Sequence, residues 1–181
     1  STSADSTARP IAVTGAGTGG FVFKMSGSGG SLAFTGGITN SSSGGLTIQT
    51  TSNGTIALSA ANIVNGGQLV TFDTNTGGIS EALGMLISGT GGLTKTGSGT
   101  LTINSVTNSY TGPTNINGGT LTVAQLSVVS AGSSLGNIGS TINVANAISS
   151  AITLEDTSTS ADSTARPIAV AGAGTGGFVF K

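Results

Sequence analysis

This sequence has few reactive or charged side chains. It contains no cysteine, histidine or tryptophan, and only 6% of its 181 residues are charged. The absence of cysteine excludes disulfides and thiol chemistry, and the absence of histidine excludes most pairs of nucleophile and general base. Among the acidic residues only Glu155 and Asp156 are adjacent, and in a strand they would point to opposite faces. We therefore expect no catalytic residues and no enzymatic activity.

The shortage of charge also limits the partners. The net charge is −1, without the basic patch that nucleic acids or anionic membranes attract, so we expect no nucleic-acid partner. No apolar run approaches the roughly 18 residues of a membrane helix, and no membrane span is expected in this segment.

Two glycine-rich stretches look like ligand-binding loops but lack essential parts of them. Residues 15–20 fit the pattern G-x-G-x-x-G, yet an alternating, strand-like run follows where a dinucleotide site needs a helix. Residues 73–78 begin like a calcium loop, but the twelfth position, which should be a glutamate, is Gly84. We expect neither a cofactor nor a metal site.

Glycine and short alternating runs dominate what remains. The 32 glycines separate stretches in which apolar and hydroxyl side chains alternate, so that Leu101 and Ile103 share one strand face and threonines the other. Such runs recur about every 10 to 14 residues, which is too close for crossover helices. The pattern predicts an all-β solenoid, whose turns bury an apolar stripe by stacking. Residues 79–86 fit either a short helix or a buried strand.

One stretch resembles a known family. The sequences GGLTKTGSGTLT (residues 91–102), NSYTGPT (residues 108–114) and GGTLTV (residues 118–123) together resemble the autotransporter-associated β-strand repeat. This repeat occurs in passenger domains of bacterial autotransporters and in other large surface proteins. The resemblance implies a right-handed parallel β-helix that is secreted and displayed outside the cell, and it implies no catalytic residues.

With two or three strands in each coil, we expect about eight or nine coils. Apolar residues at alternating strand positions should fill the interior. The expected structural core is Phe21, Phe23, Leu32, Phe34, Leu46, Ile48, Ile56, Leu58, Leu93, Leu101, Ile103, Ile116, Leu121, Val123, Ile142, Val144, Ile152 and Leu154.

The two ends of the chain have nearly the same sequence. Residues 1–24 and 158–181 differ only at Thr14 and Ala171. Near-identity at an offset of 157 residues, from Ser1 to Ser158, predicts a tandem array in which residues 1–157 form one unit and residues 158–181 begin the next. The two copies should then have the same backbone conformation, related by translation along the axis and some rotation. Phe21 and Phe178 should be in equivalent settings, and so should Ile11 and Ile168. A duplicated linker is the alternative explanation.

These features predict a structural role. We expect one unit of a long extracellular or cell-surface fibre or surface layer whose main partner is itself, joined axially by stacking or as a continuous chain. The low charge favours lateral bundling as well. The alternative is an adhesin passenger that binds glycan or protein on a host or neighbouring cell through loops such as residues 40–45. Tyr110 is the single tyrosine, which leaves few rings for sugar stacking and favours the scaffold.

Overall fold

The computed structural model describes residues 4–27, 29–59, 62–81, 85–126, 133–137, 139–145, 150–172 and 174–181. Within these ranges the chain is a coil of parallel strands without a helix. Accordingly, the described residues include no helix of the length and apolar character needed to cross a membrane.

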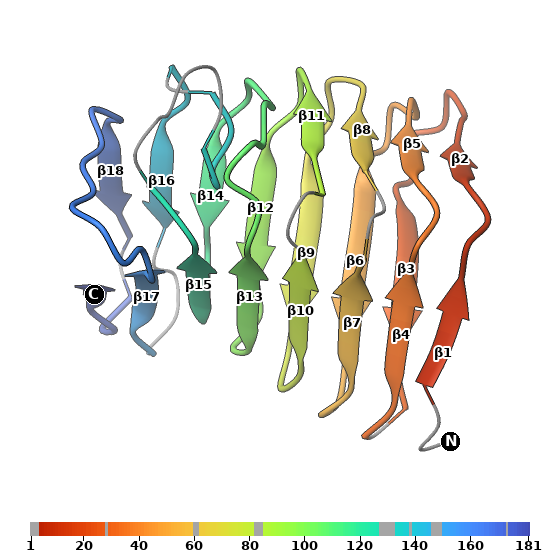
Figure 1. The fold of residues 1–181 in the computed structure, drawn as a ribbon, viewed down its shortest axis with the longest axis horizontal. Helices are drawn as coiled ribbons and strands as arrows, with labels where there is room; N and C mark the ends of the chain where they lie inside the picture. Colours follow the sequence, from red (N-terminus) through yellow and green to blue (C-terminus); the bar gives the residue numbers. More distant parts are fainter. Residues whose placement is uncertain are drawn as a thin grey trace.

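Three parallel sheets run along the coil (Figure 1). Sheet A contains β1 (Ala4–Thr7), β4 (Ser31–Phe34), β7 (Thr55–Leu58), β10 (Gly78–Glu81), β13 (Thr100–Ile103), β15 (Thr120–Val123), β17 (Ile152–Asp156) and β19 (Phe178–Phe180). Sheet B contains β2 (Ile11–Val13), β5 (Ile38–Asn40), β8 (Ile63–Asn65) and β11 (Ile87–Gly89). Sheet C contains β3 (Phe21–Met25), β6 (Leu46–Thr50), β9 (Val70–Thr74), β12 (Leu93–Thr96), β14 (Thr114–Ile116), β16 (Ile142–Ala145) and β18 (Ile168–Ala171).

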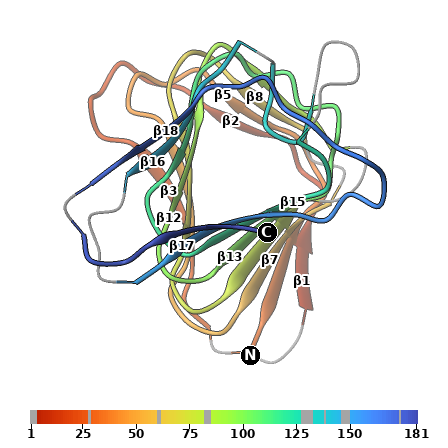
Figure 2. The ribbon, with the colours of Figure 1, turned by 90° about the vertical axis from the view of Figure 1, so that its left-hand side faces the viewer.

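The early turns visit the sheets in a fixed order. The strands β1, β2 and β3 lie in sheets A, B and C, and β4, β5 and β6 repeat this order one turn further on. Seen along the axis, the sheets form the walls of a three-sided coil (Figure 2). Because the strands pair in parallel from turn to turn, their hydrogen bonds run along the axis. The predicted all-β parallel solenoid is confirmed.

The coil has fewer turns than expected. The chain crosses sheet C seven times between β3 and β18, which makes about six turns instead of eight or nine. The early turns each use three strands, and the later turns differ in length: Thr100 pairs with Thr120 one turn on, whereas Thr120 pairs with Thr153. At about 4.8 Å between stacked strands, six turns extend for about 30 Å.

Apolar side chains from all three sheets fill the interior. Stacked positions carry similar residues, as where Leu101 lies between Ile79 and Leu121 in sheet A. Sheet B adds buried residues that the sequence pattern had not singled out, such as Ile38 and Ile63. The buried members of the expected core are Phe34, Leu46, Ile48, Ile56, Leu58, Leu93, Leu101, Ile103, Ile116, Leu121, Val123, Ile142, Val144, Ile152 and Leu154.

Three expected core residues near the N-terminal end are not fully buried. Phe21 is 46% exposed, so its assignment to the core is wrong, and Phe23 and Leu32 are only partly buried against the core. For Phe21 and Phe23 the reason is position, because β3 is the first strand of sheet C and no earlier turn covers it. Leu32 lies on β4 and has only one earlier strand, β1, beside it, where it is paired with Asp5. Phe21 packs instead on Phe23, edge to face, with ring centroids 4.7 Å apart.

The stretch at residues 79–86 continues the solenoid. Residues 78–81 form strand β10 rather than a helix, and Met85 is buried in the core. Residues 82–84 lie outside the described residues.

Candidate assembly interface

A lysine ammonium group lies inside the coil. Lys95, on β12, is fully buried, and its Nζ donates hydrogen bonds to the carbonyl oxygens of Thr96 (2.7 Å), Gly97 (2.8 Å) and Gly118 (3.0 Å). Gly118 belongs to the following turn, so the ammonium group joins two turns at one corner. Burial lowers the pKa of Lys95 to about 8, and the negative charge of Asp73 offsets part of this effect.

The tyrosine of the same stretch is also internal. Tyr110 is fully buried, and its hydroxyl lies 2.7 Å from Oγ1 of Thr114. Its ring packs so closely on Gly136 that a Cβ there would lie 2.8 Å from Cδ2 of the ring. Lys95 and Tyr110 therefore brace corners of the coil from within, and neither side chain is available to a ligand.

Buried amides line other corners. Asn40 donates from Nδ2 to Oδ1 of Asn65 one turn on, at 3.3 Å. Further along, Oδ1 of Asn108 accepts the amide hydrogen of Ile87 at 2.7 Å, and Nδ2 of Asn108 donates to the carbonyl of Ser134 at 3.0 Å. Oδ1 of Asn40 also accepts the amide hydrogen of Ser42, and Nδ2 of Asn65 donates to the carbonyl of Gly92. These side chains therefore satisfy main-chain groups near strand ends, which is a structural role.

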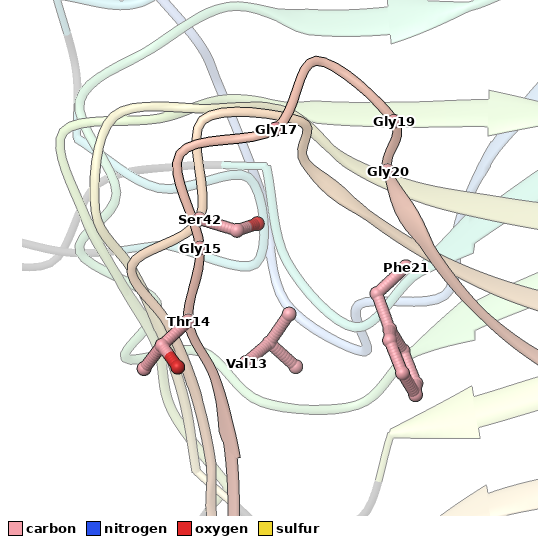
Figure 3. Close-up of a pocket in the computed structure, with 8 residues that line it drawn as sticks. All are labelled: Val13, Thr14, Gly15, Gly17, Gly19, Gly20, Phe21 and Ser42. Atoms are coloured by element: carbon pink, nitrogen blue, oxygen red, sulfur yellow. The ribbon is translucent and has the colours of Figure 1, made fainter.

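A hollow of about 240 Å³ lies at the N-terminal end of the coil, beside the loop from β2 to β3 (Figure 3). This loop carries the G-x-G-x-x-G stretch, and strand β3 follows it where a nucleotide site would need a helix. No charged side chain is among the lining residues, so the hollow offers mainly glycine main chain and apolar groups. Its lining residues are Val13, Thr14, Gly15, Gly17, Gly19, Gly20, Phe21 and Ser42.

The stretch that begins like a calcium loop starts in strand β9. Its Asp73 accepts a hydrogen bond from Nε2 of Gln49 at 2.6 Å. In the part of the chain that the structure describes, no three acidic, histidine or cysteine side chains come together in a way that could hold a metal ion.

Both ends of the coil expose apolar side chains on strands with an unpaired edge. At the N-terminal end, Phe21 and Val22 on β3 are 46% and 52% exposed. At the other end, Val170 on β18 and Phe180 on β19 are 58% and 53% exposed. Each of these three strands lies at an edge of its sheet, so its free main-chain groups could pair with a further strand.

A buried arginine fixes the C-terminal segment to the preceding turn. Nη1 of Arg166 donates to the carbonyl of Leu135 (2.9 Å) and to Oγ of Ser140 (2.6 Å). Nη2 donates to Oγ of Ser133 at 2.8 Å and to the carbonyl of Gly136. We call the group formed by Ser133, Leu135, Gly136 and Ser140 the arginine pocket.

The two copies of the repeated end sequence lie on different sheets. Phe21 is on sheet C, whereas its counterpart Phe178 is on sheet A; Ile11 is on sheet B, whereas Ile168 is on sheet C. The two copies are therefore related by a rotation about the axis as well as a translation, but their settings are not equivalent, because the first copy pairs only with the following turn and the second only with the preceding one. The displacement is by one sheet in both cases, because 157 residues span six turns and one further sheet of the coil.

Comparison with known proteins supports the resemblance noted for the central stretch. Residues 93–123 match the model of the passenger-associated-transport-repeat family. This stretch runs from β12 to β15. It therefore includes the two corners of the coil that Lys95 and Tyr110 brace from within. No curated protein and no solved structure matches the chain.

Proposed function

We propose that this chain is one structural unit of a long right-handed parallel β-solenoid, displayed outside the cell as a fibre or surface layer. The observation that carries the proposal is that both ends of the coil present unpaired strands with exposed apolar side chains. A coil with these ends is suited to continue into another unit. The passenger-type repeat at residues 93–123 supports an exported, surface-displayed protein, and the scaffold has no catalytic role.

The adhesin alternative has less support from the described residues. The hollow beside β3 has no charged lining residue and only Phe21 as an aromatic one. Tyr110, the single tyrosine, is buried and cannot serve as a sugar-stacking platform.

Light scattering combined with electron microscopy tests the proposal. At micromolar concentration the chain should form rods longer than the roughly 30 Å of its own six turns. A monomer that remains soluble for days at that concentration would contradict axial assembly.

A further inference from the structure

The two copies of the end sequence pair with neighbouring turns on opposite sides. In the first copy, β1, β2 and β3 pair with β4, β5 and β6 of the following turn, and their other edges are free. In the second copy, β18 and β19 pair with β16 and β17 of the preceding turn, and again the other edges are free. The same segment within a longer coil would have both neighbours at once.

Two local backbone features of the segment are alike in the two copies. The equivalent glycines Gly15 and Gly172 have φ angles of 146° and 149°. The amide of Arg9 donates to Oγ1 of Thr7 at 3.4 Å, and in the second copy the amide of Arg166 makes the same bond to its own threonine, Thr164, at 3.2 Å. These two features persist while the neighbours change, whereas residues 161–164, the equivalents of β1, form no strand in the second copy.

Each copy contains two adjacent glycines, Gly19-Gly20 in the first and Gly176-Gly177 in the second. Their contacts depend on whether the following or the preceding turn is present. In the first copy a Cβ on Gly20 would lie 2.6 Å from the carbonyl oxygen of Gly44 in the following turn, whereas Gly19 faces open space. In the second copy the residue equivalent to Gly19 is Gly176, and a Cβ there would overlap the carbonyl oxygen of Ser150 in the preceding turn. Contact with a preceding turn, as at Gly176, would account for the glycine at position 19.

An interior doublet with the same surrounding sequence has both neighbours. Residues 89–92 repeat the sequence GTGG of residues 17–20. A Cβ on Gly91 would overlap the carbonyl oxygen of Gln68 in the preceding turn, and one on Gly92 would overlap the carbonyl oxygen of Pro113 in the following turn. The doublets at the two ends each show one half of this arrangement.

We propose that the surface which holds residues 158–181 is a docking site for residues 1–24 of a second unit. In that junction Arg9 of the incoming unit enters the arginine pocket, Gly19 lies on Ser150, and Phe21 pairs with Ile152. This rests on the proposed axial assembly and specifies one contact between units, which forms where residues 158–181 leave the surface that they occupy in the single chain. The exposed Arg9 and the half-exposed Phe21 then become buried, as Arg166 is and as Phe178 partly is.

The junction also fixes the rotation between units. Since the second copy lies one sheet further round than the first, each unit is turned by one face of the three-sided coil relative to the unit before it. A surface feature that occurs once in each unit therefore faces three successive directions along the rod.

In the single chain the docking site is already occupied by the chain's own residues 158–181. A tethered segment has a high effective concentration and outcompetes a free one of the same sequence. Weakening the tethered copy alone should therefore open the site to residues 1–24 of another chain.

The test uses the full chain and a matched pair of substitutions. Gly176→Ala places a methyl group against Ser150 and releases the tethered copy, whereas Gly19→Ala meets nothing in the isolated chain. In sedimentation velocity, the Gly176→Ala chain should associate head to tail at least about tenfold more tightly than the unmodified chain. The double variant, which carries both Gly19→Ala and Gly176→Ala, should lose this gain in association. The incoming segment then brings its own methyl group against the carbonyl oxygen of Ser150.

The double variant exposes the same apolar surface as Gly176→Ala, so it controls for unspecific aggregation. Equal association of the single and double variants would overturn the junction, and so would a Gly176→Ala chain that associates no better than the unmodified one. Rods formed equally by all these chains would overturn the junction while leaving the fibre proposal intact. Arg166→Ala, with and without Arg9→Ala, provides a second pair. The Arg166→Ala chain should associate more tightly than the chain that carries both substitutions.

Discussion

For single residues, the direction of the side chain decides what the coil tolerates. Leu101→Asp places a carboxylate between Ile79 and Leu121, where nothing pairs with it, and should lower the free energy of unfolding by about 3–5 kcal/mol. Thr102→Asp, on the partly exposed outer face, should cost less than about 1 kcal/mol. Thermal unfolding of the two variants measures the difference, and equal losses would mean that the strand register is wrong.

Lys95 should make stability depend on alkaline pH. Its folded-state pKa of about 8 lies below the ordinary 10.5, so between these values the unfolded chain binds more protons. The free energy of unfolding should therefore rise with pH through this window. The rise should be at most about 3 kcal/mol, since each unit of difference between the folded and unfolded pKa is worth about 1.4 kcal/mol.

The Lys95→Met variant isolates this effect, because it removes the titrating group and leaves the other side chains that titrate at alkaline pH unchanged. Denaturant unfolding of both chains across this pH range gives the difference. A difference that stays constant with pH would show that the ammonium group is not destabilised by burial, and that its three carbonyl partners compensate fully.

The burial of Lys95 could be inferred from the sequence, but only in part. Leu93 and Lys95 alternate with Thr94, which places both on the inward face. A buried charge is nevertheless costly, and the carbonyl groups that receive it come from residues 96, 97 and 118, whose meeting depends on the stacking of two turns. The alternation of side chains shows which face of the strand Lys95 lies on, but it does not show which groups bind its ammonium group.

Among the structural elements, the segment at residues 158–171 depends on the arginine pocket. Arg166→Ala removes four hydrogen bonds, to two carbonyls and two hydroxyls, and should cost about 2–4 kcal/mol. Arg9→Ala removes the same residue from the same local sequence, but from an exposed site, and should change stability by less than about 0.5 kcal/mol. Hydrogen exchange of the β18 amides reports the effect, and similar exchange in both variants would contradict the pocket.

The strands of sheets A and C could largely be predicted, whereas those of sheet B could not. Runs such as residues 46–48 and 120–123 alternate over enough positions to show an inward face. The strands of sheet B have only three residues each, as at Ile38–Asn40 and Ile63–Asn65, which is too short for a pattern to be recognised. The expected number of coils was too high for this reason, because three strands share each early turn.

At the scale of the whole molecule, the repeated ends illustrate a limit of sequence reasoning. Near-identity of residues 1–24 and 158–181 indicates a repeat but not its angle about the axis. That angle depends on how many residues each turn consumes, and the turn from Thr120 to Thr153 is longer than the one before it. The sheet on which Phe178 falls therefore emerges only from the folded coil.

X-ray fibre diffraction from aligned native assemblies tests most directly whether the coil continues along the fibre. The strands stack along the axis of each unit, so the strand spacing of about 4.8 Å should appear along the rod, together with a unit repeat of about 30 Å. A 4.8 Å reflection perpendicular to the rod, or none along it, would contradict a continuous solenoid.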